Sequence, residues 1–166
     1  MNTVLRPPRQ AVHLPSPCEQ RQRADMVSMP QDDLASGIEF ARMNSAYARH
    51  GGMLRSDEAV RQMRELWDQP ISVLAKWIVA RTMITIDWRR EVLIPMFQID
   101  LCEGRLRPGC AEIIRELRDV MDDWEIARWF SVGNPWLGGS PPVDIMVTSS
   151  REAFHAARVA RFIARG

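Results

Sequence analysis

Side chains that could carry out chemistry are few and scattered along this chain. The three histidines, His13, His50 and His155, lie far apart, and none has a Cys, Asp or Glu at the spacing of a metal site. The chain contains no nucleophile elbow, no phosphate-binding glycine loop and no His-Glu-x-x-His motif. The sequence therefore predicts a protein that is not an enzyme and that has no catalytic residue, cofactor or metal.

Two other sets of reactive side chains have simpler explanations. Asp122 and Asp123 are adjacent, and adjacent residues on a helix do not face each other, so we interpret them as helix caps. The cysteines, Cys18, Cys102 and Cys110, are odd in number and widely spaced, which argues against a disulfide framework and a zinc site. This cysteine usage favours a reducing cytoplasm, and neither a signal peptide nor a membrane span is predicted.

The composition is typical of a globular protein of one domain. The chain has 166 residues, of which 46% are hydrophobic and 26% charged. Its formal net charge of +1 gives no general attraction to nucleic acid, so any DNA contact has to be local.

The elements that must position functional residues begin after a long tail. Residues 1–30 contain five prolines and four arginines without apolar periodicity, which predicts a disordered tail; a basic arm on a phosphate backbone is the alternative. Helices are predicted from the caps Asp32 or Asp33 to Gly51-Gly52, from Ser56 to Gln69, and over 71–80. The inward-facing residues predicted on these three helices are Leu34, Ile38 and Ala41, then Val60, Met63 and Trp67, then Leu74, Trp77 and Ile78.

A change of pattern at residue 82 predicts a β-hairpin at about 82–99. Two apolar, β-branched runs flank the charged turn at Arg89-Arg90, and Pro95 is expected at an edge or bulge. Helices are predicted again after Pro108, after Asp122-Asp123, and over 150–164, where Ser149 and Glu152 form a capping box. The last helix has a small-residue face, for which we expect Ala153, Ala156, Ala157, Ala160 and Ile163.

The predicted fold is therefore mainly α with a small β-hairpin, a Pro/Gly loop over 133–146 and a C-terminal helix. Three regions follow: the tail 1–30, a helical region 31–81, and a region 82–166 that packs with 31–81 as one compact unit.

The segment "GNPWLGGSPPVDIM", residues 133–146, combines turn residues with large apolar ones. Its prolines restrict the backbone before any partner arrives, and Trp is the residue type most enriched at interface hot spots. Asn134 is expected to tie the turn to its own backbone. Trp136 and Leu137 either fill the core between the last two helices or contact a partner, and the sequence leaves both alternatives open.

Several segments, in order, resemble the Xre/MbcA/ParS family of bacterial antitoxins. They are "LIPMFQID", "RPGCAEIIREL", "DDWEIARWF", "NPWLGGSPPVDIM" and the Ala-rich "REAFHAARVARFIA", which together span about residues 70–166. The family's strand motif is matched by Pro95, Phe97 and Gln98, and its Trp and Trp-Phe pair by Trp124, Trp129 and Phe130. Its Asn-Pro loop is matched by Asn134, Pro135, Leu137, Gly139 and Pro142. Asp144 matches a position that is often polar.

The resemblance implies a protein partner. Members of this family bind a RES-domain toxin, an enzyme that consumes NAD, and block its NAD site with their C-terminal part. The toxin-binding residues that we carry over or infer beside them are Asn134, Pro135, Trp136, Leu137, Gly138, Gly139, Pro142, Asp144, Arg158, Arg161 and Arg165. These three arginines share one helix face, where they either favour the helix C-terminus or pair with acidic residues of the toxin.

Many members also carry an N-terminal helix-turn-helix for operator DNA, and here this chain departs from the pattern. After "LAKWIVAR" a strand follows where a recognition helix is needed, so region 31–81 resembles a degenerate helix-turn-helix. Arg81, Arg89 and Arg90 are weak candidates for phosphate contacts, and a solvated turn is the alternative. A DNA-binding autorepressor and an orphan interaction module remain as alternative functions, with assembly as a homodimer or as a hetero-oligomer with toxin.

Overall fold

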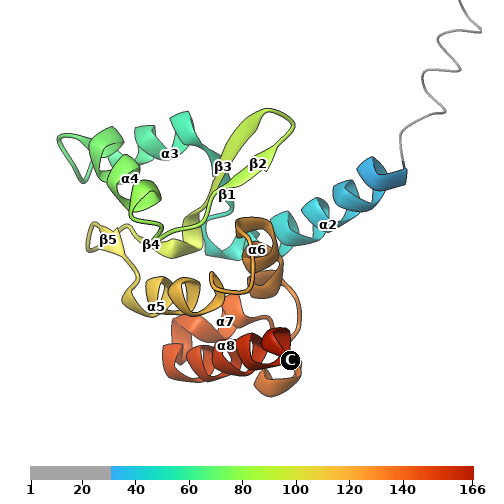
Figure 1. The fold of residues 1–166 in the computed structure, drawn as a ribbon. Coiled ribbons are helices and arrows are strands. Elements are labelled where there is room, and N and C mark those ends of the chain that lie inside the picture. Colours follow the sequence, from blue (N-terminus) through green and yellow to red (C-terminus); the bar gives the residue numbers. More distant parts are fainter. Residues whose placement is uncertain (1–30) are drawn as a thin grey trace, which may run out of the picture. The chain divides into compact units, whose positions relative to one another are not determined.

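A computed structural model describes residues 31–166, with side chains from Leu34 onward. The predicted tail over residues 1–30 and the side chains of Asp32 and Asp33 lie outside this part. The chain divides between Gly37 and Ile38, and all contacts given below lie within the compact unit Ile38–Gly166. As the sequence predicts, the fold is mainly α with a small antiparallel sheet (Figure 1).

Helix α2 spans Gln31–Tyr47 and continues into the 3-10 turn η1, Ala48–His50. Gly51 then ends it with a left-handed backbone, φ 93°, where glycine is favoured. The inward face is not the predicted one, because Leu34, Ile38 and Ala41 are exposed while Met43 and Tyr47 are buried. The helix carries two apolar stripes of helical spacing, and periodicity alone does not decide which of them meets the core.

A short strand that the sequence did not predict, β1 (Met53–Arg55), precedes the helices α3 (Ser56–Met63) and α4 (Pro70–Val79). Ser56 is the first helical residue of α3 and not its cap, since the backbone N–H of Arg55 donates to the Glu58 carboxylate at 3.1 Å. The connection between the helices covers residues 64–69, which is longer than the three- or four-residue turn of a helix-turn-helix.

The predicted hairpin is present but shorter than 82–99. Strands β2 (Ile86–Trp88) and β3 (Glu91–Pro95) pair so that Trp88 lies opposite Glu91. The two-residue turn between them has positive φ at Arg89 (49°) and Arg90 (69°), the backbone of a type I′ turn. The sheet order is β1-β3-β2, which makes β3 the central strand and places Pro95 at its end opposite Met53.

The apolar run after β3 leaves the sheet through the 3-10 turn η2 (Met96–Gln98) and forms a second, unpredicted hairpin. Its strands are β4 (Ile99–Asp100) and β5 (Arg105–Leu106). Gln98 is fully buried, where its side chain accepts from the Ile84 N–H at 2.7 Å and donates to the carbonyls of Ile84 and Pro95, both at 3.0 Å. These bonds satisfy both backbone groups of Ile84, which lies outside the strands, and the carbonyl of Pro95 at the end of β3.

The C-terminal region consists of α5 (Pro108–Leu117), α6 (Asp123–Ser131), η3 (Pro135–Leu137), α7 (Pro142–Thr148) and α8 (Ser150–Arg165). Pro108 begins α5 and Asp122 caps α6 by accepting from the Glu125 N–H at 2.8 Å, which confirms both predictions. The expectation of a loop over all of 133–146 is wrong, because residues 142–146 belong to α7. No capping box forms at Ser149, whose N–H instead completes α7 by donating to the Ile145 carbonyl.

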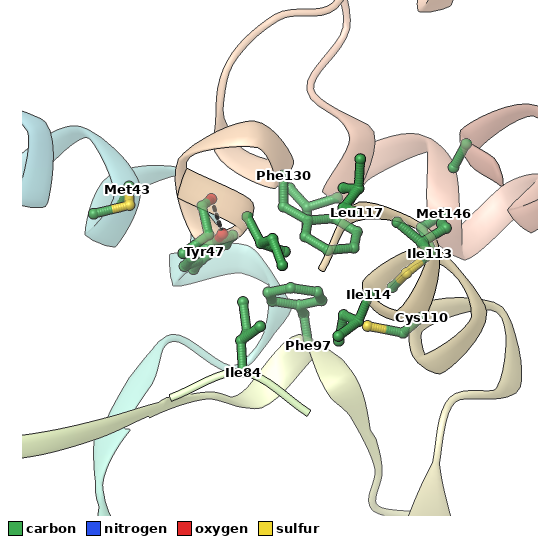
Figure 2. Packing of buried hydrophobic residues seen from close by; sticks show 14 of the residues in the cluster. Met43, Tyr47, Ile84, Phe97, Cys110, Ile113, Ile114, Leu117, Phe130 and Met146 are labelled. Carbon is green, nitrogen blue, oxygen red and sulfur yellow. Dashed lines mark hydrogen bonds between the residues drawn. The ribbon is translucent and has the colours of Figure 1, made fainter. Parts of the chain in front are cut away.

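The main core lies between α2, the sheet and the C-terminal helices (Figure 2). Phe97 packs between Tyr47 and Phe130, with ring centroids 4.9 Å and 4.8 Å away. The Tyr47 hydroxyl donates to the Ala127 carbonyl, so that its polar end is satisfied. On another side of this core α8 packs against α5. Three residues of the predicted small-residue face of α8, Ala153, Ala156 and Ala157, are buried.

A second buried cluster holds α3 and α4 on the sheet, with Met63, Leu74, Met83 and Ile94 as members. Of the residues predicted to face inward on α4, Leu74 is buried and Trp77 is half-buried, but Ile78 is exposed. Within residues 31–166, no helix combines the length and the apolar character needed to cross a bilayer.

Candidate partner-binding site

The turn between α6 and α7 is held by the hydrogen bonds of one residue, Asn134. Its side-chain oxygen accepts from the Trp136 N–H at 2.9 Å, and its carbonyl accepts from the N–H groups of Leu137 and Gly139, each at 2.9 Å. The Asn134 side chain is itself buried. These bonds confirm the prediction that Asn134 ties the turn to its own backbone, and they limit its freedom before any partner binds.

Close backbone packing explains two glycines of this turn. A Cβ atom at Gly133 would lie 2.4 Å from the Gly139 carbonyl oxygen, which no side chain tolerates. Gly138 has φ 64°, in the left-handed region, where it ends η3. The turn therefore has one defined shape, which depends on glycine at both positions.

Trp136 projects from this turn into solvent. Its relative exposure is 67%, whereas the next residue, Leu137, is half-buried. The alternative in which Trp136 fills the core between the last helices is therefore wrong. Two thirds of this large aromatic side chain is left uncovered on a rigid turn, which is the arrangement expected of a contact residue.

Further apolar side chains are exposed on the elements around Trp136. Val132 lies at the end of α6, and Phe162 and Ile163 lie near the end of α8, which contacts η3. Figure 1 shows the C-terminal end of α8 beside the connection from α6 to α7. We call Val132, Trp136, Phe162 and Ile163 the Trp136 surface.

A hollow adjoins this surface at the end of α6. Its volume is about 270 Å³, and its apolar lining comes from Met121, Trp129, Val132 and Pro135. Glu125 and Arg128 lie on its polar side. A space of this size accommodates one or two apolar side chains of a partner, whose burial there would remove both sets of carbon atoms from water.

Two of the predicted toxin-binding residues connect α7 to the rest of the chain. Pro142 is buried at the start of α7. The Asp144 carboxylate lies 2.7 Å from the His50 ring nitrogen and 3.6 Å from the Arg49 guanidinium, which joins α7 to the end of η1. We therefore interpret Pro142 and Asp144 as residues that hold the turn in place.

The three arginines of α8 have different surroundings. Arg161 pairs with Glu116 at 2.9 Å and with Asp119 at 3.2 Å, and Arg165 pairs with Asp119 at 3.1 Å. Both therefore fasten α8 to the end of α5. Arg158 is exposed and forms no ion pair with any residue of the described part.

The candidate DNA contacts do not share one environment. Arg89 and Arg90 form the exposed hairpin tip, and the Arg89 guanidinium stacks 5.4 Å from the Trp88 ring centroid. Arg81 follows α4 and lines a cavity of about 350 Å³ with Arg115 and Arg118. The pKa of Arg118 is lowered. Burial is the main cause, and the ion pair with Asp123, at 3.1 Å, offsets it only in part.

The remaining reactive side chains are used in packing or lie alone. Burial raises the pKa of the Cys110 thiol and of the Tyr47 hydroxyl well above their ordinary values. Cys102 and His155 are exposed, while His13 and Cys18 lie outside the described residues. Between residues 34 and 166 no group of three or more His, Cys, Asp or Glu side chains is placed to hold a metal ion.

Sequence reasoning missed most of the Trp136 surface outside the turn. Ile163 was expected on the buried face of α8, but its side chain is exposed, because α8 is longer than the helix α5 that covers it. The available signal was Phe162, a large apolar residue that lies off the Ala153, Ala156 and Ala157 stripe. Comparison with protein-family models, with curated proteins and with solved structures gives no match to this chain.

Proposed function

We propose that this protein is an antitoxin or antitoxin-like protein that binds a RES-domain toxin and covers the toxin's NAD site. The main support for a binding function is the exposed side chain of Trp136, which lies on a turn fixed by Asn134. The kind of partner comes from the resemblance of residues 70–166 to Xre/MbcA/ParS antitoxins. The chain needs no reactive group for this activity, since occlusion alone blocks an active site.

The rigidity of the turn supports this role. A loop that becomes ordered on binding loses on the order of 1 kcal/mol or more of free energy per residue. The turn at 134–139 already has its hydrogen bonds in the free protein, so most of that cost is absent. Trp136 would enter the partner while the hollow beside it, lined by Met121 and Trp129, receives a side chain in return.

Helix α8 supports the turn and extends the contact area. Its salt bridges from Arg161 and Arg165 to α5 hold its last turns in place, and Phe162 and Ile163 are exposed there. Arg158 is the residue that we assign to an acidic group of the toxin. Because Ala153, Ala156 and Ala157 are buried, deleting α8 would open the core, so its role must be tested by point substitutions.

The decisive experiment is co-expression of this chain with the adjacent reading frame, followed by co-purification and an NAD-consumption assay. We expect a stable complex whose NAD consumption is suppressed. Trp136→Ala should weaken the complex, whereas Val92→Ala, an exposed apolar residue on β3, should leave it intact. The absence of any complex with neighbouring gene products, or a complex that consumes NAD at the rate of the free toxin, would exclude the proposed function.

A second candidate function, DNA binding, is favoured by one observation. A hairpin whose exposed tip is Arg89-Arg90 follows the helix pair α3–α4, and exposed arginines on a protruding turn can contact phosphates. Against it, α4 exposes Ile71, Ile78 and Val79 where a recognition helix would need polar side chains. A mobility shift on the upstream DNA that weakens steeply with salt, and is lost in Arg89→Ala/Arg90→Ala, would support this alternative.

A further inference from the structure

The cavity of about 350 Å³ between the ends of α4 and α5 is lined mainly by arginines. Its charged lining consists of Arg81, Arg115, Arg118 and Asp119. Arg115 lies in the last turn of α5 and Arg118 is the cap of that helix, so the two are three residues apart on one helix face. Arg81 reaches the cavity from the other side, where it follows α4. We call this space the arginine cavity; it shares no residue with the Trp136 surface.

Arg118 is fixed in the wall of this cavity by its own chain. Its Nη2 atom donates to the Met83 carbonyl and lies 3.1 Å from the Asp123 carboxylate, and only 12% of its side chain is exposed. Burial is the main cause that lowers the pKa of Arg118; Asp123 acts against it, and the charge of Arg81 acts in the same direction as burial. A largely desolvated positive charge is therefore held close to a second one.

The other two arginines of the lining have no carboxylate to compensate them. Among residues 34–166 neither Arg81 nor Arg115 forms an ion pair. Asp119, the one acidic residue of the lining, already pairs with Arg161 at 3.2 Å and with Arg165 at 3.1 Å. The arginine cavity therefore carries two positive charges in excess.

Attraction to the helix ends does not account for this excess. Cations are favoured at the C-terminal end of a helix because its last carbonyls lack partners. At the end of α4 these carbonyls accept from the N–H groups of residues 80–82 at 2.9–3.1 Å; they belong to Lys76, Trp77 and Ile78. At the end of α5 the Leu117 carbonyl accepts from two N–H groups, both at 2.9 Å. Little partial negative charge is left there for the arginines.

We propose that the arginine cavity binds a phosphate group, either as inorganic phosphate or as the monoester of a small molecule. A phosphate dianion brings two negative charges, which equal the excess of the cavity. Its oxygens accept charge-assisted hydrogen bonds from guanidinium groups, whose planar fork matches them. A carboxylate brings one charge and two oxygens and compensates the cavity only in part. The inference does not rest on the proposed function, because it concerns other residues and another class of ligand.

The test is titration calorimetry of the full chain at constant ionic strength and about pH 7.5, where phosphate is mostly a dianion. One titration uses inorganic phosphate and a second uses ribose 5-phosphate, so that the comparison shows which source is preferred. We expect saturable binding of at least one of them with a dissociation constant of about 1 mM or below, and much weaker binding of acetate. Arg81→Ala/Arg115→Ala should raise this constant at least tenfold. Both side chains are exposed, so the circular-dichroism melting curve of this variant without phosphate should match that of the wild type.

Arg89→Ala/Arg90→Ala is the matched control, since it removes the same charge from two exposed arginines at the hairpin tip, which does not line the arginine cavity. It should leave phosphate binding unchanged. Amide shifts give a second measurement that needs no variant: phosphate should move the signals of Thr82 and Ala111, which line the cavity, and not those of the hairpin tip.

Two results would overturn the inference. One is the absence of saturable binding of phosphate and of ribose 5-phosphate up to about 20 mM, a range in which even a weak site fills by mass action. The other is an equal loss of binding in the two double variants, which would show a general attraction of anions to surface arginines and no site in the arginine cavity.

Discussion

Trp136→Ala separates an interface role from a packing role, because the two roles predict opposite changes. A Trp or Phe buried in a core costs about 3–5 kcal/mol of folding free energy when it is truncated to alanine. With Trp136 67% exposed, only a third of its surface is buried, so the loss of stability should be about 1 kcal/mol. For a chain of 166 residues that is a fall in Tm of about 2–4 °C.

The effect on binding should be larger. A Trp at the centre of an interface contributes at least about 2 kcal/mol by alanine substitution. The dissociation constant of the toxin complex should therefore rise about 30-fold. Titration calorimetry with the co-purified toxin measures this change, and a thermal melt of the free protein measures the change in stability.

Phe130→Ala is the matched control for this prediction. Phe130 is fully buried in the main core, so its truncation should cost about 3–5 kcal/mol of stability. At a temperature where that variant remains folded, its affinity for the toxin should change little. If Trp136→Ala instead lost more stability than Phe130→Ala and kept full affinity, the placement of Trp136 at an interface would be refuted.

Three other changes test the elements that support the site. Gln98→Leu removes the partners of the Ile84 N–H and carbonyl and should cost about 2–5 kcal/mol in urea unfolding; a loss below about 1 kcal/mol would show that these groups find other partners. Gly133→Ala places a Cβ 2.4 Å from the Gly139 carbonyl oxygen and should distort the turn, which NMR would detect as altered amide shifts at 134–140. The control is Gly52→Ala, whose Cβ meets no neighbouring atom; despite its strained φ, it should leave those shifts unchanged. Burial raises the pKa of the Cys110 thiol, so at pH 8 little of it is ionised and the sulfur is shielded from reagents. Iodoacetamide should therefore label Cys102 but leave Cys110 unlabelled until the protein unfolds, and rapid labelling of Cys110 in the native protein would contradict its burial.

Signals that act within a few residues were sufficient to predict several elements of this protein. Pro108 starts α5, Asp122 caps α6, and Asn134 fixes its own turn, because in each case the interacting groups are close in sequence. The hairpin around Arg89-Arg90 and the small-residue face of α8 were predicted for the same reason. The fold class follows from these local elements.

The tertiary structure decided which apolar residues are buried and which are exposed. The pairing of β1 with β3 joins residues about forty positions apart, and the Asp144–His50 contact joins residues 94 apart, so neither leaves a local pattern. Periodicity showed that α2 and α4 carry apolar faces. It did not show which face of each helix is buried, because that depends on where the other elements pack. The exposure of Trp136 and of Ile71 was settled in the same way: by itself the sequence determined that these residues are large and apolar, and only the packing of distant segments left them facing solvent.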